Sequence, residues 1–374
     1  TLGAQWRMIK KYLPEMMYGS KYAERLPIGT KESIETFSYE SLRRFYKDWY
    51  RPDLMALIVV GDIEVGKMKE LVTKYFEDVP KPSNPRERVV YSLPNHSDTK
   101  ISSVSDEEAF VNTVQIMYKD LEDTTPMTTV GDYKSYLIDR LFSSMINARL
   151  DELATSSKPP FLNAYSSYGD GFARTKKMYS SNATSTNKES LPTTIKAILT
   201  ENKRVSEHGF LQSELDRAKQ NILTSLENQV KEKGKQNSGR LVSQYIRHFL
   251  QSEPIPGIEW EYKTAKNLFD EIKLEEVSSR IYDYIHPENM VVVVQQKEEE
   301  GEDIFDDESV LEIMKEVENA QVTAYQESEL RNDLIEVIPE AGSIVSKDYD
   351  EKLDVTRLVL SNGVKVTYKQ TNFK

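Results

Sequence analysis

Cysteine is absent from this chain of 374 residues, and histidine occurs only four times. The first absence excludes disulfides, thiol nucleophiles and every metal site that needs cysteine ligands. It does not separate oxidising from reducing compartments, because a protein without cysteine is stable in either. The small number of histidines leaves few ways to build a metal site from imidazole ligands.

Basic side chains are in the minority, with 49 Lys and Arg against 61 Asp and Glu and a net charge of −12. A nucleic-acid-binding protein normally carries a basic surface, so we expect no nucleic-acid partner. Long apolar runs are also missing. The strongest, LMALIVVG at residues 54–61, is too short for a membrane span and predicts a buried strand. The composition, 38% hydrophobic and 29% charged, is typical of a globular protein of two to three domains.

Both ends of the chain predict a fragment of a longer protein. Residues 1–17 are amphipathic and contain no initiator Met, basic leader or apolar signal core. Residues 357–370 predict a hairpin around Asn362-Gly363, a pair suited to a type I′ turn. Because an isolated hairpin is only marginally stable in water, we expect it to have neighbours beyond this chain.

The hydrophobic pattern predicts an α+β fold. Residues 1–95 alternate helix and strand, with a helix that Ser38 caps, the strand at 54–61, a further helix, and a proline-rich linker at 79–88. Residues 96–297 predict a second domain, with strands near 101–104 and 111–118, a long helix over 130–153, two Tyr- and Ser-rich strands, several helices and a closing strand, NMVVVVQQ. Strands and helices that are segregated in this way favour an α+β layer over an alternating parallel sheet.

An acidic run at residues 298–308 holds eight carboxylates in eleven positions. It is most simply a solvated hinge, because such a run cannot bury itself. Calcium binding is the sharper alternative, although the spacing matches no EF-hand loop. A short helix follows the run, and a polar linker then leads to the terminal hairpin.

No catalytic, cofactor-binding or metal-ligating residue emerges from local motifs. The histidines (His96, His208, His248 and His286) are widely separated, and none has a second histidine at helical spacing. There is no P-loop, no G-x-G-x-x-G and no G-x-S-x-G elbow. The 21 tyrosines suit either a peptide-binding surface or ordinary packing.

Residues 18–64, YGSKYAERLPIGTKESIETFSYESLRRFYKDWYRPDLMALIVVGDIE, resemble a stretch of the pitrilysin/insulinase-type zinc peptidases, especially the bacterial processing-protease-like branch. Further similar segments follow in the family's order: LFSSMINARLDEL, KPPFLNAYSS, RVSEHGF with SELDRAKQNIL, PGIEWEY, and the tail TRLVLSNGVKVTYKQTNFK. The resemblance therefore extends over nearly the whole chain.

The resemblance implies a four-domain clamshell of two similar halves, each made of two related domains with a mostly antiparallel sheet packed by helices. Residues 1–95 would then be the C-terminal part of the first peptidase domain, and 96–297 the complete second, inactive domain. Residues 298–352 would be the acidic linker between the halves, and 353–374 the opening hairpin of the third domain.

The family's catalytic motif is His-x-x-Glu-His, in which two His hold zinc and the Glu activates water. None of these residues falls on a position here, so the resemblance implies zinc in the parent protein with its ligands upstream of Thr1, and none in this fragment. Arg149 and Tyr165 lie in a place loosely similar to the family's substrate-binding Arg/Tyr pair, but their spacing differs and no role is carried over to them.

Two hypotheses within the family remain open. The chain is a supporting fragment of a zinc metallopeptidase, inactive by itself, or it belongs to a non-catalytic structural or substrate-binding subunit. A stand-alone interaction protein is a third possibility. The expected partners are peptide substrates, held through sheet-edge pairing, and the remaining halves of the same chain. No membrane span is expected, and a periplasmic location follows only by analogy with bacterial relatives.

Overall fold

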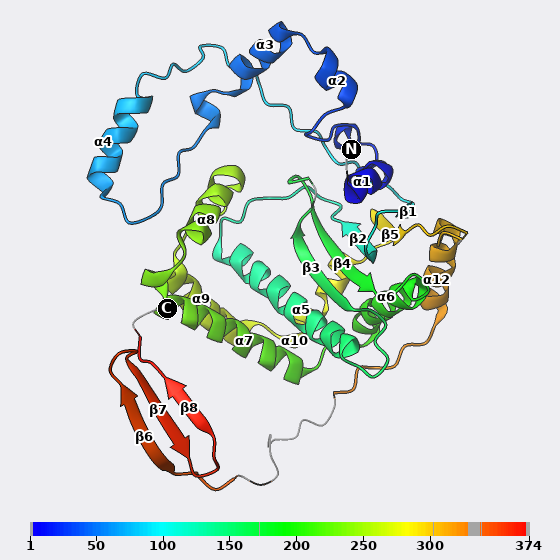
Figure 1. The fold of residues 1–374 in the computed structure, drawn as a ribbon. Coiled ribbons are helices and arrows are strands. Elements are labelled where there is room, and N and C mark those ends of the chain that lie inside the picture. The colour runs from blue at the N-terminus through cyan, green and yellow to red at the C-terminus, as the bar shows by residue number, and fades with distance from the viewer. Residues whose placement is uncertain (1–2, 172, 302, 328–336, 338, 372–374) are drawn as a thin grey trace. The chain divides into compact units, whose positions relative to one another are not determined.

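The computed structural model describes residues 3–171, 173–301, 303–327, 337 and 339–371. The chain divides into two compact units, Thr1–Tyr325 and Gln326–Lys374. The first combines a sheet with packed helices, which confirms the α+β fold class (Figure 1). Glu302 of the acidic run, residues 328–336 and 338 of the expected linker, and the last three residues of the tail lie outside the described residues.

A five-stranded sheet with the order β1-β5-β2-β4-β3 organises the first unit. Its strands are β1 (Lys100–Asp106), β2 (Asn112–Lys119), β3 (Asn163–Asp170), β4 (Lys177–Ser185) and β5 (Met290–Lys297). Only β1 and β5 run parallel, and the other neighbouring pairs are antiparallel. The last strand in the sequence, β5, therefore lies inside the sheet, while β3 forms an edge.

The sequence of β5 shows why both faces of the sheet are covered. Val292 and Val294 lie in the main core, whereas Val291 and Val293 lie in a second core on the opposite face. All four are completely buried. Side chains alternate between the faces of a strand, so an unbroken apolar run is suited to a strand with a partner layer on each side.

Helices cover the main-core face of the sheet (Figure 1). They are α5 (Val130–Ala154), α6 (Leu191–His208), α7 (Gln212–Lys231), α9 (Ile258–Glu271), α10 (Leu274–Ser278) and α11 (Arg280–Tyr284). A capping box of Thr129 and Asp132 begins α5, and Gly209, with φ of +68°, ends α6 as the His208-Gly209 pair predicts. The expected break in the region 213–250 lies between α7 and α8 (Ser238–Gln251).

The amphipathic N-terminal segment packs on the opposite face. Helix α1 (Ala4–Met16) buries Met8, Tyr12 and Met16 against Val291 and Val293 in the second core. Arg7 also reaches the end of β1, where its guanidinium pairs with Asp106 at 2.6 Å. Helix α1, expected to lie in a separate first domain, thus covers the second face of the sheet formed by residues 100–297.

The helix–strand–helix unit expected after residue 38 is only partly present. Ser38 caps α3 (Tyr39–Trp49) as predicted, and α2 (Lys31–Thr36) and α4 (Val65–Phe76) lie on either side. The prediction of a buried strand at residues 54–61 is wrong: the segment forms no strand, none of its residues is buried, and Leu57 is 56% exposed. The physical reason is that no neighbouring strand pairs with this segment among the described residues.

The acidic run is tethered where the structure describes it. The side-chain amide of Gln296 accepts a hydrogen bond from the Phe305 N–H (2.9 Å) and donates one to the Phe305 carbonyl (2.8 Å). The expected short helix follows as α12 (Asp307–Asn319), which buries Val310 in the main core. Beyond it, Lys203 and Arg204 of α6 donate to backbone carbonyls of residues 317–323. The residues up to Thr323 are therefore held against α6, and the Tyr325 hydroxyl donates to Glu152 of α5.

The second unit is a three-stranded antiparallel sheet rather than a lone hairpin. Strands β7 (Val355–Leu360) and β8 (Lys365–Tyr368) form the expected hairpin, and β6 (Ile344–Asp350), from the segment predicted as linker, pairs with β7. The type I′ assignment is wrong, because Gly363 has a positive φ and Asn362 does not. The Gly363 N–H donates to the Leu360 carbonyl, so the tight turn spans residues 360–363, with Ser361 and Asn362 at its centre and Gly363 as its last residue.

Candidate functional site

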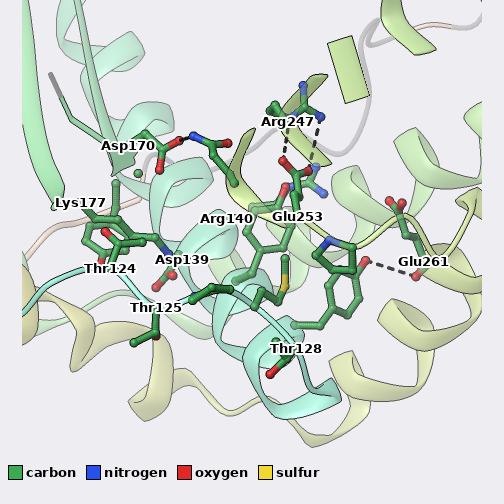
Figure 2. Close-up of a pocket in the computed structure, with 18 of the residues that line it drawn as sticks. Thr124, Thr125, Thr128, Asp139, Arg140, Asp170, Lys177, Arg247, Glu253 and Glu261 are labelled. Carbon is green, nitrogen blue, oxygen red and sulfur yellow. Dashed lines mark hydrogen bonds and ion pairs between the residues drawn. The ribbon is translucent and has the colours of Figure 1, made fainter. Parts of the chain in front are cut away.

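A cleft of about 970 Å³ lies in the first unit beside α5. Its walls come from the polar side of α5, the segment at 124–129 that precedes it, α8, the start of α9 and the C-terminal end of β3. Figure 2 shows Asp170 and Lys177 at one end of the cleft and Glu261 at the other. Concave sites of this size with a few convergent polar groups are the usual places for ligands.

The amphipathic pattern of α5 sets one wall of the cleft. Leu137, Leu141 and Met145 are buried in the main core, so the opposite side of the helix presents Arg140 and Asn147 to the cleft. Because side chains three and four apart share a helix face, the pattern that builds the core also aligns the polar wall.

A network of tyrosines and charges closes the β3 end. The Tyr284 hydroxyl donates to Asp139 at 2.6 Å, the Tyr168 hydroxyl donates to Asp120 at 2.7 Å, and the two rings stack with centroids 4.5 Å apart. Arg280 forms an ion pair with Asp139 at 3.2 Å. Burial nevertheless raises the pKa of Asp139, because desolvation outweighs these favourable partners.

The loop after α8 and the first turn of α9 add further carboxylates to the cleft. Arg247 pairs with Glu253 at 2.7 Å, and Gln251 donates to Asp170 at 2.6 Å (Figure 2). Glu261, in the first turn of α9, is partly buried, and desolvation raises its pKa. The rings of Trp260 and Tyr133 lie beside it, with centroids 5.3 Å apart.

The free edge of β3 borders the cleft. The Asn147 side chain accepts from the Ser166 N–H (2.7 Å) and donates to the Ser166 carbonyl (2.8 Å), so this residue's backbone faces away from β4. Backbone groups of alternate residues in an antiparallel strand point the same way, and those of Tyr168 and Asp170 therefore face the open side as well. An extended peptide could pair with them.

The four histidines do not come together. His96 is 6% exposed, and its Nδ1 lies 2.7 Å from the Asp98 carbonyl, while its Nε2 has no hydrogen-bond partner among the described residues. His208 and His248 contact the carbonyls of Val322 and Glu253, and His286 lies edge-on to Tyr118. No group of three or more His, Asp or Glu suited to a metal is found in the part of the chain that the structure describes.

Arg149 and Tyr165 have unrelated surroundings. Arg149 is 2% exposed and bonds Glu214 through Nε at 2.7 Å and Glu201 through Nη1 at 3.0 Å, between the rings of Phe210 and Tyr325. Arg149 therefore fills the space between two aromatic rings and pairs with two buried carboxylates. Tyr165 is exposed on β3.

Sequence reasoning did not identify Asn147 or Glu261. The only signal for Glu261 was its place in the PGIEWEY segment.

No helix among the described residues is long and apolar enough to cross a membrane. Two curated relatives and one solved structure illustrate what the chain resembles. It is 29% identical to "Zinc protease PQQL-like" of Arabidopsis thaliana over 99% of this chain and 36% of that protein. It is 25% identical to "Probable zinc protease PqqL" of Escherichia coli over 97% of this chain and 39% of that protein.

The crystal structure of the periplasmic protease PqqL from Escherichia coli shares the fold, with a TM-score of 0.78 and 21% identity, over 99% of this chain and 41% of that chain. The present chain thus spans about two fifths of the relatives it matches. Residues 36–222, half of the sequence, match the family model described as "Peptidase M16 inactive domain". The chain belongs to the peptidase M16 family and includes its inactive, non-catalytic type of domain.

Proposed function

We propose that this chain supports peptide hydrolysis by a zinc-dependent metalloendopeptidase, holding an extended peptide for a catalytic centre elsewhere in the full-length protein. The observation that carries the proposal is the cleft that continues from the open edge of β3, where the backbone groups of Tyr168 and Asp170 face away from β4 and meet no partner strand among the described residues. Main-chain pairing gives affinity for many sequences, as a protease substrate site requires.

In this proposal residues 1–95 complete the first peptidase domain, 96–297 form the inactive domain, 298–352 link the halves, and 353–374 open the third domain. Exposed apolar side chains support the first part, among them Leu42 at 52%, Phe45 at 55% and Leu57 at 56%. Patches of this kind mark surfaces that another part of a protein covers. The remaining halves of the same chain are the proposed partners.

Zinc belongs to the parent protein in this proposal, because relatives of this chain are named as zinc proteases. We derive no catalytic step from this chain. A periplasmic location is proposed from the related protease of that compartment. Metal analysis that finds one tightly bound zinc per chain, together with chelator-sensitive cleavage, would contradict the assignment of a supporting role.

Peptide binding tests the proposal directly. Fluorescence anisotropy of a fluorescein-labelled, unstructured ten-residue peptide is measured with the 374-residue chain and two variants. Asp170→Ala and Asp170→Pro both lose the contact with Gln251, but only the proline variant loses the backbone N–H. We expect Asp170→Pro to bind roughly 5-fold more weakly than Asp170→Ala, the effect of one net hydrogen bond. Equal affinities would contradict edge pairing.

A further inference from the structure

Glu261 differs from the other carboxylates of the cleft in its partners. Glu253, Asp139 and Asp170 are each held by a donor of the chain itself. The Glu261 carboxylate has no hydrogen bond or ion pair with any residue that the structure describes, although it is partly buried. Because removing a carboxylate from water without a partner is costly, this arrangement favours a cation from outside the chain.

An aromatic wall lies at the same end of the cleft, where the Tyr133 hydroxyl donates to the Glu261 backbone carbonyl at 3.5 Å. Trp260, Tyr133 and Tyr136 form a row with ring centroids 5.3 Å and 5.9 Å apart. Tyr133 is buried, whereas Trp260 and Tyr136 are 39% and 44% exposed. The face of an aromatic ring attracts cations, and Trp does so most strongly. The Glu261 carboxylate and the exposed ring of Trp260 thus provide two attractions for a positive charge in one part of the cleft.

The chain itself places one guanidinium on this wall. The Arg140 guanidinium lies 5.8 Å from the centroid of Tyr136 and forms no ion pair with a carboxylate among the described residues. Its charge lowers the proton affinity of Glu261 without contacting it. Arg140 therefore shows that the Tyr136 ring accepts a guanidinium, and it also competes electrostatically with any second cation that approaches Glu261.

We propose that Glu261, with Trp260, forms a subsite that binds a basic side chain of the extended peptide. This inference rests on the proposed function. Arginine fits better than lysine, because a planar guanidinium stacks on aromatic rings and pairs with a carboxylate through two parallel hydrogen bonds. Figure 2 shows Glu261 at the end of the cleft away from Asp170, so the basic residue lies several positions from the part that pairs with β3.

Two matched peptides test the subsite. Each is a labelled ten-residue peptide of Gly, Ser, Thr and Val with one central residue, either arginine or its neutral isostere citrulline. We expect anisotropy to show about 5- to 10-fold tighter binding of the arginine peptide at low salt, and a smaller ratio at 0.5 M salt. Equal binding of both would overturn the inference but leave the proposed function standing. If neither peptide binds, both fail.

Variants then assign the effect to Glu261. Glu261→Gln should abolish the preference for arginine over citrulline. Glu259→Gln, the matched control in the same helical turn, removes a carboxylate that pairs with Lys233 outside the cleft and should leave the preference intact. Arg140→Gln should increase the preference about 2- to 3-fold, because it removes the competing charge. If Glu261→Gln and Glu259→Gln behave alike, or Arg140→Gln weakens the preference, Glu261 is not the recognition group.

Discussion

Replacing Arg149 by Met should cost about 3 kcal/mol of folding free energy. The side chains of Arg149, Glu201 and Glu214 are only 2%, 4% and 3% exposed. Removing one partner from a buried ion pair costs about 3–5 kcal/mol, because the opposite charge stays buried without compensation. The lower figure applies here, since Glu201 keeps Arg204 at 2.8 Å and Glu214 keeps the Leu211 N–H at 2.7 Å. Methionine retains most of the volume between Phe210 and Tyr325.

The assay is urea unfolding followed by circular dichroism and tryptophan fluorescence, with the midpoint compared between variants. The triple variant Arg149→Met, Glu201→Gln, Glu214→Gln serves as control, because it removes the unpaired charges and keeps the shape of the side chains. It should regain at least half of the lost stability. A loss below about 1 kcal/mol in the single variant, or a triple variant less stable than the single one, would refute the reasoning.

Four further changes have defined outcomes. Burial lowers the pKa of the Lys119 ammonium to about 8, below its value of about 10.5 in the unfolded chain. The charged ammonium therefore destabilises the fold by about 3 kcal/mol below pH 8, and this penalty disappears as pH rises to about 10.5. Lys119→Met should therefore raise the melting temperature at pH 7 and lose this advantage at pH 10; a variant less stable at pH 7 would contradict it. Desolvation also lowers the pKa of His96, so the fold should lose stability as pH falls below about 6.5, and His96→Asn should flatten that loss in melting curves. Asn147→Ala should strengthen binding of the labelled peptide about 3-fold by freeing the Ser166 backbone, whereas Ser144→Ala, elsewhere in the cleft wall, should not. Gln296→Ala should accelerate proteolysis between residues 298 and 304, because the clamp on Phe305 is lost; unchanged cleavage would mean that other contacts hold this loop.

Local patterns predicted those elements whose partners lie within the chain. The Ser38 cap before Tyr39 and the His208-Gly209 stop specify helix ends through neighbouring atoms alone. The segment at 54–61 has an equally strong strand composition, yet it forms no strand, because pairing requires a second segment that composition does not reveal.

The cleft was beyond local reasoning for a different reason. Glu261 and Arg140 are 121 positions apart in the sequence, and only the packing of α9 near α5 brings them to one wall. In a chain with 61 acidic residues, a single important carboxylate has no local signature. The family resemblance did single out the segment around Trp260, but it could not say which side chain would lack a partner.

The internal position of β5 has a consequence for synthesis on the ribosome. Both of its neighbours precede it by more than 170 residues, and α1 contacts the same strand from the very start of the chain. Until residue 297 has emerged, β1 has no neighbour in the sheet and the apolar side of α1 lacks Val291 and Val293. Strand pairing between such distant segments slows folding, and the folding intermediates expose apolar surface that promotes aggregation. We therefore expect the nascent chain to depend on chaperones until its last valines arrive.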